Sequence, residues 1–189
     1  MSGHGFGPVW GPDSRLLILG TWPSPKSREM GFYYGHPQNR FWPLLAALTG
    51  RPWPQTIPEK KALILESGLA LWDTLESCTI QGARDETIRD PVPNDVAGLL
   101  KASGICAVAC NGAAAHRFYQ KFAQPLTGLE ALRLPSTSPA NAAWTMPRLE
   151  QAWGEALAPY LKGKLQTLNE LLEEVNPCPV PEGEAVNKA

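Results

Sequence analysis

Four short apolar runs alternate with amphipathic segments along this chain. The apolar runs cover residues 16–19, 69–72, 104–110 and 131–134, and turn-forming residues follow each of them. Helical periodicity predicts helices over residues 40–48, 58–67, 94–102, 113–122 and 144–172, with a break at Pro159. Strands that alternate with helices favour a parallel sheet that is covered on both faces. We therefore predict an α/β fold, with a four-stranded, mainly parallel sheet flanked by helices in a single domain.

The remaining segments are polar or rich in proline and glycine. We expect residues 1–14 to be a flexible N-terminal segment, residues 15–175 to form the domain, and residues 176–189 to be a flexible tail. Residues 76–93 show no sustained period, which predicts a loop. A length of 189 residues suits one α/β domain with such tails.

The C-terminal ends of parallel strands meet at one edge of a sheet, and open α/β proteins bind their ligands there. The segments that follow the four strands should therefore converge: Gly20-Thr21-Trp22, Asp73-Thr74, Asn111-Gly112 and residues 135–141. None of them contains a phosphate-binding Walker motif or a dinucleotide fingerprint. The architecture alone thus predicts a site at this edge.

Residues 20–40 form a long irregular segment after the first strand. Loops of this length in compact domains are usually functional or disordered, and the aromatic content here disfavours disorder. Adjacent residues of an extended segment point in opposite directions, so one of Tyr33 and Tyr34 should pack inward while the other faces a pocket. Stacking of a nucleobase on such a ring contributes about 1–3 kcal/mol. The segment is typical of a pocket wall for a flat, hydrogen-bonding ligand.

Asn39 and the loop 135–141 each admit two interpretations. Asn39 precedes a predicted helix and would serve as its N-cap, but its amide also suits the positioning of a water or the reading of a base edge. The loop is either an ordinary connection or a phosphate-binding segment, because hydroxyls and backbone amides bind phosphate oxygens well. Local positive charge would come from basic residues near these segments: Lys26, Arg28, Arg133 and Arg148.

Charge and cysteine content narrow the class of protein. The formal net charge is −1, so any positive potential for a nucleic acid must be local. We find no apolar run of membrane-spanning length and no secretory signal pattern. The four cysteines, Cys78, Cys106, Cys110 and Cys178, form no CxxC pair, and Cys106 and Cys110 lie in an apolar run typical of free buried thiols. A cytoplasmic, reduced protein without a metal or other cofactor is expected.

Taken together, these segments resemble the uracil-DNA glycosylase superfamily, and within it the hypoxanthine (deoxyinosine) DNA glycosylases. The stretch GTWPSPKSREMGFYYGHPQNRFW is similar to the first motif of that group, LPSTSPAN to its second, and DETIRDPVPN to its middle section. The resemblance runs from about residue 16 to residue 160. It implies a monofunctional enzyme that flips a deaminated base out of DNA and excises it hydrolytically, hypoxanthine above all. It also implies a cofactor-free monomer that acts on the bacterial nucleoid.

The resemblance assigns roles to particular residues. It implies that Asn39 is the catalytic residue and positions a water, because an amide is too weak a base to abstract a proton. It implies a base-binding set, Gly20, Thr21, Tyr34 and Asp73, and a DNA-binding loop, Ser136, Ser138, Pro139, Ala140 and Asn141, with residues 139–141 at its tip.

Two positions depart from related enzymes. Trp22 stands where mismatch-specific uracil glycosylases carry a water-positioning asparagine, and Ser136 where ordinary uracil glycosylases carry a histidine. Two alternatives therefore stay open. One is a mismatch-specific uracil-DNA glycosylase, and the other is a nucleic-acid-binding module without turnover, its site blocked by Trp22.

Overall fold

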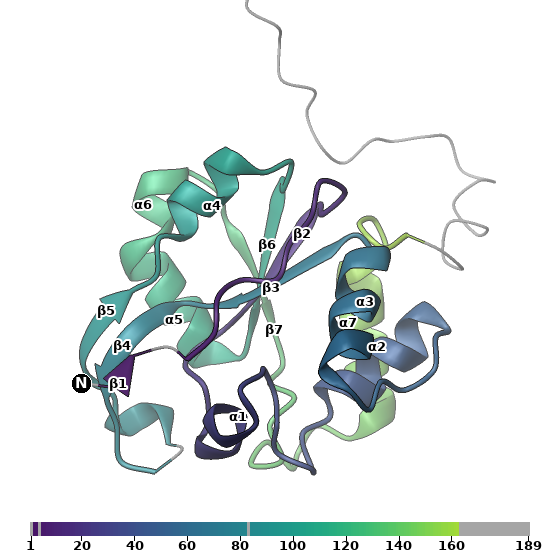
Figure 1. Ribbon diagram of the computed structural model, residues 1–189, viewed down its shortest axis with the longest axis horizontal. Coiled ribbons are helices and arrows are strands. Elements are labelled where there is room, and N and C mark those ends of the chain that lie inside the picture. The colour runs from purple at the N-terminus through teal and green to yellow at the C-terminus, as the bar shows by residue number, and fades with distance from the viewer. Residues whose placement is uncertain (1, 4, 83, 163–189) are drawn as a thin grey trace, which may run out of the picture.

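The computed structural model describes residues 2–3, 5–82 and 84–162. Its central sheet has the strand order β3-β2-β6-β7, and every neighbouring pair is parallel. The strands are β2 (Leu16–Gly20), β3 (Leu69–Asp73), β6 (Ala107–Asn111) and β7 (Ala131–Leu134). The predicted fold class, an α/β domain around a four-stranded parallel sheet, is confirmed (Figure 1).

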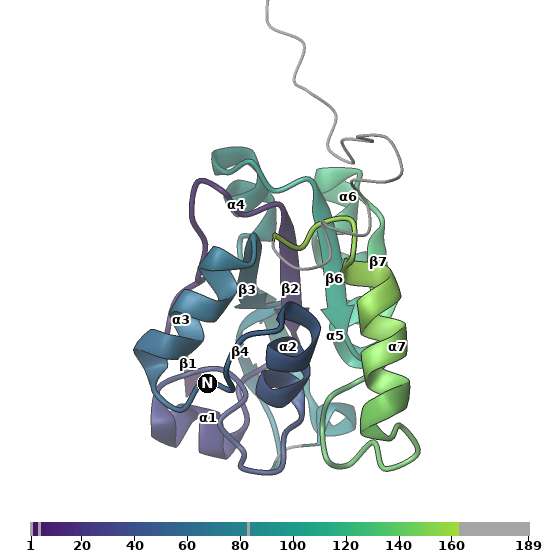
Figure 2. The same cartoon turned by 90° about the vertical axis from the view of Figure 1, so that its right-hand side faces the viewer.

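Helices cover both faces of this sheet. The helices α2 (Phe41–Thr49), α3 (Ile57–Glu66) and α7 (Met146–Leu157) lie on one side, and Figure 2 views the molecule from that side. The helices α4 (Val96–Ala102), α5 (Ala113–Phe122) and α6 (Gln124–Thr127) lie on the other. In β2, Leu16 and Ile18 join the core on the α2 side, whereas Leu17 and Leu19 join the core on the α5 side. This strand is thus buried on both faces, which explains its unbroken apolar sequence.

The prediction of a loop over residues 76–93 is wrong. The strands β4 (Leu75–Thr79) and β5 (Arg89–Pro93) pair antiparallel around a single 3-10 turn, η1 (Asp85–Thr87). With β1 (Ser2–Gly3) they form a second sheet, in the order β1-β4-β5. Only Leu75 and Cys78 of β4 are buried, and the pairing contains two register shifts. The hairpin therefore has no regular apolar alternation that a sequence pattern could reveal.

Other element boundaries differ from the predictions in smaller ways. The last helix begins at Met146 and ends at Leu157, and residues 163–172 of the predicted helix lie outside the described residues, as does the tail 176–189. The short helices α1 (Pro25–Met30) and α6 were not predicted. No helix within the described ranges is long and apolar enough to cross a membrane.

The N-terminal segment, which we expected to be flexible, makes specific contacts with the domain. Val9 and Leu71 exchange backbone hydrogen bonds of 2.9 and 2.8 Å. The hydroxyl of Tyr33 donates to the carbonyl oxygen of Gly7 over 2.8 Å. Residues 7–9 therefore lie against β3 and the loop that follows β2.

The cysteines divide into two kinds. Cys78 and Cys110 are buried free thiols, and burial raises the pKa of Cys110 to about 12. The expectation of a free thiol is wrong for Cys106, which is disulfide-bonded. Cys106 precedes β6 and is partly exposed, so the sheet does not enclose its sulfur as it encloses that of Cys110. Cys178 lies outside the described residues.

Candidate active site at the C-terminal edge of the sheet

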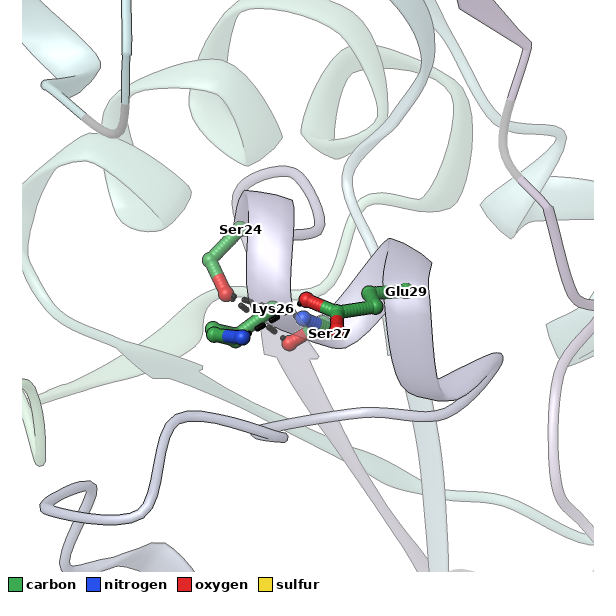
Figure 3. Close-up of polar contacts among 4 residues, drawn as sticks. All are labelled: Ser24, Lys26, Ser27 and Glu29. Atoms are coloured by element: carbon green, nitrogen blue, oxygen red, sulfur yellow. Dashed lines mark hydrogen bonds and ion pairs between the residues drawn. The ribbon is translucent and has the colours of Figure 1, made fainter.

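Helix α1 anchors the long loop that follows β2. The hydroxyl of Ser24 caps the helix by accepting a 3.2 Å hydrogen bond from the backbone N–H of Ser27. The hydroxyl of Ser27 is buried and accepts the N–H of Gly35 over 3.0 Å, which ties the following segment to the helix. Lys26 forms a 2.7 Å ion pair with Glu29, so much of its charge is already balanced within α1 (Figure 3).

The two adjacent tyrosines of this loop have different surroundings. Tyr33 is 2% exposed and lies in the hydrophobic core, whereas Tyr34 is only partly buried. The ring of Tyr34 stacks on Phe41, with ring centroids 3.9 Å apart and an angle of 24° between the planes. Tyr34 also has a φ of 51°, a left-handed conformation that is uncommon for a bulky residue. Such strain is often found at functional sites.

The hydroxyl of Tyr34 points to the end of β2. A Cβ atom added to Gly20 would lie 3.1 Å from this hydroxyl and 2.2 Å from Oδ1 of Asp73, so only glycine fits there. The Tyr34 oxygen is buried, and the side chain of Asn111 lies near it. Burial raises the pKa of Tyr34, and the charge of Asp73 raises it further, so the hydroxyl stays protonated. Three residues of the predicted base-binding set, Gly20, Tyr34 and Asp73, thus meet at this edge.

Thr21 contacts a carboxylate that the sequence did not single out. Its hydroxyl donates to Oδ2 of Asp85 over 3.2 Å, and its carbonyl oxygen accepts from the Thr74 hydroxyl over 3.2 Å. Burial raises the pKa of Asp85, and the hydrogen bond from Thr21 opposes that shift. Asp85 reaches this place from η1 in the hairpin, which was predicted to be a loop, so no pattern placed it beside β2.

The side chain of Asn39 makes two hydrogen bonds at one atom. Its Oδ1 accepts the backbone N–H of Phe41 and the hydroxyl of Thr137, both over 3.0 Å. The first bond closes a turn just before α2, whose N-cap is Arg40 and not Asn39. The second joins the first motif to the loop that follows β7. The interpretation of Asn39 as the N-cap is therefore wrong, and its Nδ2 group makes no hydrogen bond among the described residues.

The loop 135–141 is ordered by its own polar groups. The Ser136 hydroxyl accepts the N–H of Ser138, and the Ser138 hydroxyl accepts the N–H of Ala140, over 3.2 and 3.3 Å. Nδ2 of Asn141 donates to the carbonyl oxygen of Ser136 over 2.9 Å. Pro139 is partly exposed and Ala140 is exposed. The exposed tip is thus smaller than predicted, because Asn141 holds the loop together.

Arg40 joins this loop to the first motif, and the sequence reasoning missed it. Its Nε donates to the carbonyl oxygen of Thr137 over 3.2 Å, and its Nη2 to those of Ser138 and Asn141 over 2.6 and 3.2 Å. Its Nη1 donates to the carbonyl oxygen of Trp144. The only available signal was an arginine directly after HPQN, which by itself is an ordinary surface residue.

Trp22 packs away from the stacked pair of Tyr34 and Phe41. It belongs to a small hydrophobic cluster on the side of α5, together with Leu75, Cys78, Ile88 and Phe118. Tyr34 and Phe41 belong to the core on the side of α2. The large side chain that replaces the water-positioning asparagine therefore lies in hydrophobic packing.

An open cavity of about 780 Å³ adjoins the loop, between β7 and α7. It is lined in part by Gly112, Arg133, Ser136, Asn141 and Trp144. No group of three or more potential metal-binding side chains occurs in the part of the chain that the structure describes. The polar contacts at this edge therefore come from amides, hydroxyls, two carboxylates and Arg40.

Comparison with known proteins identifies the family. Residues 8–161 match the uracil DNA glycosylase superfamily, and the chain belongs to that superfamily. Two relatives carry the name hypoxanthine DNA glycosylase. The one from Methanosarcina acetivorans is 33% identical over 155 residues, which cover 79% of this chain and 94% of the relative. The one from Methanosarcina barkeri is 32% identical over 160 residues, which cover 82% and 98%.

A solved structure shows the same fold. The solution NMR structure of a candidate uracil DNA glycosylase from Methanosarcina acetivorans superimposes with a TM-score of 0.67 at 28% sequence identity. The match covers 79% of this chain and 95% of that protein.

Proposed function

We propose that this protein is a monofunctional DNA glycosylase that excises deaminated bases, with hypoxanthine in deoxyinosine as its main substrate. Two relatives named hypoxanthine DNA glycosylase match it over 94% and 98% of their own lengths. The observation that carries the proposal is the convergence of Gly20, Tyr34 and Asp73 at the edge where Asn39 lies. The enzyme would act as a monomer on nucleoid DNA in the cytoplasm, without a cofactor.

Binding would begin with extrusion of the damaged base, since an enzyme cannot reach the glycosidic bond within a stacked duplex. The face of Tyr34 opposite Phe41 would stack on the flipped base. Hypoxanthine carries a carbonyl where adenine carries an amine, so a protonated hydroxyl or a backbone N–H at this edge would favour hypoxanthine. The hydroxyl of Tyr34 lies in the plane of the stacking ring, so the donor to the base edge would be a backbone N–H near Gly20 and Thr21.

Hydrolysis would then replace one bond at the sugar with another. The oxygen of a water forms a bond to C1′ while the bond from C1′ to N9 breaks, and the electron pair leaves with the purine. One proton of the water is lost and the purine anion takes up a proton. Hydrogen-bond donors directed at the departing purine would stabilise its negative charge. Asn39 would hold the water, which is a matter of positioning.

The two alternatives differ in their support. A non-catalytic binding module was suggested by Trp22, but this side chain packs in a hydrophobic cluster with Leu75 and Phe118. Excision of uracil remains a second candidate, because the similar solved structure is described as a candidate uracil DNA glycosylase. Both can be tested in one experiment.

The test is a set of labelled duplexes, each with one hypoxanthine, xanthine or uracil, incubated with the protein in EDTA and then treated with alkali. We expect cleavage at hypoxanthine to be fastest and cleavage without alkali to be absent. Asn39→Ala serves as the control for a contaminating glycosylase. No release of any base, or release only with added metal, would contradict the proposal.

A further inference from the structure

Three side chains from distant parts of the chain form a directed series of hydrogen bonds. Nδ2 of Asn111, at the end of β6, donates to the Thr137 hydroxyl over 2.9 Å. That hydroxyl donates to Oδ1 of Asn39 over 3.0 Å. Thr137 is 0% exposed and Asn111 is 8% exposed, so water does not compete for these bonds. The series links β6, the loop after β7 and the first motif.

Backbone amides at both ends fix the direction of this series. The N–H of Thr137 donates to Oδ1 of Asn111 over 3.0 Å, so the other amide atom of Asn111 must be the donor. The N–H of Phe41 donates to Oδ1 of Asn39 over 3.0 Å, so that atom must be the oxygen. The single hydrogen of the Thr137 hydroxyl, placed between these two amides, can therefore point only to Asn39.

This arrangement limits what Asn39 can do. A carbonyl oxygen has two lone pairs, and Oδ1 of Asn39 already accepts two hydrogen bonds. Its Nδ2 group makes none within the described residues, and the side chain is partly exposed. Asn39 is therefore available to a ligand as a donor and not as an acceptor.

We propose that Thr137, held by Asn111, is a positioning residue that fixes the Asn39 amide with its Nδ2 group toward the reacting atoms. Nδ2 would donate to the oxygen of the attacking water and hold it beneath C1′, and the proton of that water would pass to solvent water. Without the Thr137 hydroxyl, one lone pair of Oδ1 becomes free and can bind the water through its hydrogen instead. This inference rests on the proposed glycosylase activity.

The test compares single-turnover base release by Thr137→Val and Thr137→Ser. Valine is close to threonine in shape but lacks the hydroxyl, and serine keeps it. We expect Thr137→Val to slow release about tenfold or more, the loss that 1.4 kcal/mol of barrier represents, while Thr137→Ser stays within about threefold of wild type. Binding of duplex, measured by fluorescence anisotropy, should change little in either variant.

A double variant separates positioning from general damage. If Thr137 acts through Asn39, the variant Asn39→Ala with Thr137→Val should be no slower than Asn39→Ala alone. Additive losses, or a Thr137→Val enzyme that works at the wild-type rate, would overturn the inference. If the wild-type protein releases no base at all, the proposed function fails instead, so the two failures are distinguishable.

A measurement on the wild-type protein covers the case in which Thr137→Val does not fold. In ¹⁵N-labelled protein, the Nδ2 hydrogens of Asn39 should shift when a duplex with 2′-fluoro-deoxyinosine, which resists hydrolysis, is added. The Nδ2 hydrogen of Asn111 that donates to Thr137 should keep its position. Unchanged Asn39 signals in the saturated complex would contradict the inference.

Discussion

Nη2 of Arg40 lies 2.6 Å from the carbonyl oxygen of Ser138, although 98 residues separate them in the sequence. The same guanidinium donates to three further carbonyl oxygens, those of Thr137 and Asn141 in the loop 135–141 and that of Trp144 just after it. Arginine suits this task because its planar group presents five donors in a fixed geometry. The side chain of Arg40 in the first motif is thereby bonded directly to the backbone of the second motif.

Replacing Arg40 with lysine should therefore destabilise the protein even though the charge is kept. A single ammonium cannot satisfy four carbonyl oxygens, and each hydrogen bond to a charged group contributes about 1.5–3 kcal/mol. We expect the free energy of unfolding in urea to fall by about 2 kcal/mol or more. Arg148→Lys is the matched control, because Arg148 is exposed and donates to one carbonyl oxygen, that of Ala143. Equal effects of the two substitutions would show that Arg40 does not join the motifs.

The two tyrosines should respond to substitution in opposite ways. Tyr34→Ala should slow base release strongly because it removes the stacking surface, which contributes about 1–3 kcal/mol per base. Tyr34→Phe keeps the ring and removes a buried hydroxyl that makes no close hydrogen bond, so its melting temperature should stay near that of wild type. Tyr33→Ala should instead lower the melting temperature, since Tyr33 is in the core. Loss of activity in Tyr33→Ala with normal stability would reverse this assignment.

The partly buried carboxyl of Asp85 should make stability depend on pH. Burial raises its pKa above the unfolded value, so between the two values the native state binds more protons, and stability falls as pH rises through that range. Asp85→Asn keeps the acceptor for Thr21 and removes the charge. Its melting temperature should exceed that of wild type at pH 7, and the gap should close at about pH 3, below the ordinary pKa of about 3.9. Glu76→Gln, at an exposed position of β4, is the control for the loss of one carboxylate.

The exposed tip of the second-motif loop should matter most in a paired duplex. Flipping leaves a hole in the base stack, and unstacking costs a few kcal/mol, which a small inserted wedge can offset. We expect Pro139→Gly with Ala140→Gly to slow hypoxanthine release in a fully paired duplex more than in a single strand. Asn141 is left unchanged, because its side chain holds the loop. Equal slowing on both substrates would show that the tip shapes the pocket and does not act as a wedge.

The sequence predicted the central sheet well because its strands are buried on both faces. Leu16, Leu17, Ile18 and Leu19 are all 0% exposed, so burial leaves a continuous apolar run. The hairpin β4–β5 gave no such signal, because most of its residues face solvent and its register is irregular. The pattern of apolar residues reveals strands that are buried, so it cannot predict a hairpin whose residues are mostly polar and exposed.

The sequence predicted where the site lies, but it predicted only some of the residues that form it. The edge followed from the parallel topology, and it brings Gly20 and Asp73 into register on neighbouring strands. Asp85, Arg40 and Thr137 were missed because their importance depends on contacts with residues far away in the sequence. Thr137 contacts Asn39 across 98 positions and Asn111 across 26, and no local pattern encodes such pairings.

Arg40 holds the second-motif loop only through main-chain oxygen atoms, and this has a consequence for how such enzymes can diversify. Every residue type has a backbone carbonyl, so the hydrogen bonds from Arg40 do not depend on which side chains stand at positions 138, 141 and 144. The anchor of the loop therefore tolerates sequence change at positions 138 and 144, whereas Thr137 and Asn141 are fixed by the bonds of their own side chains.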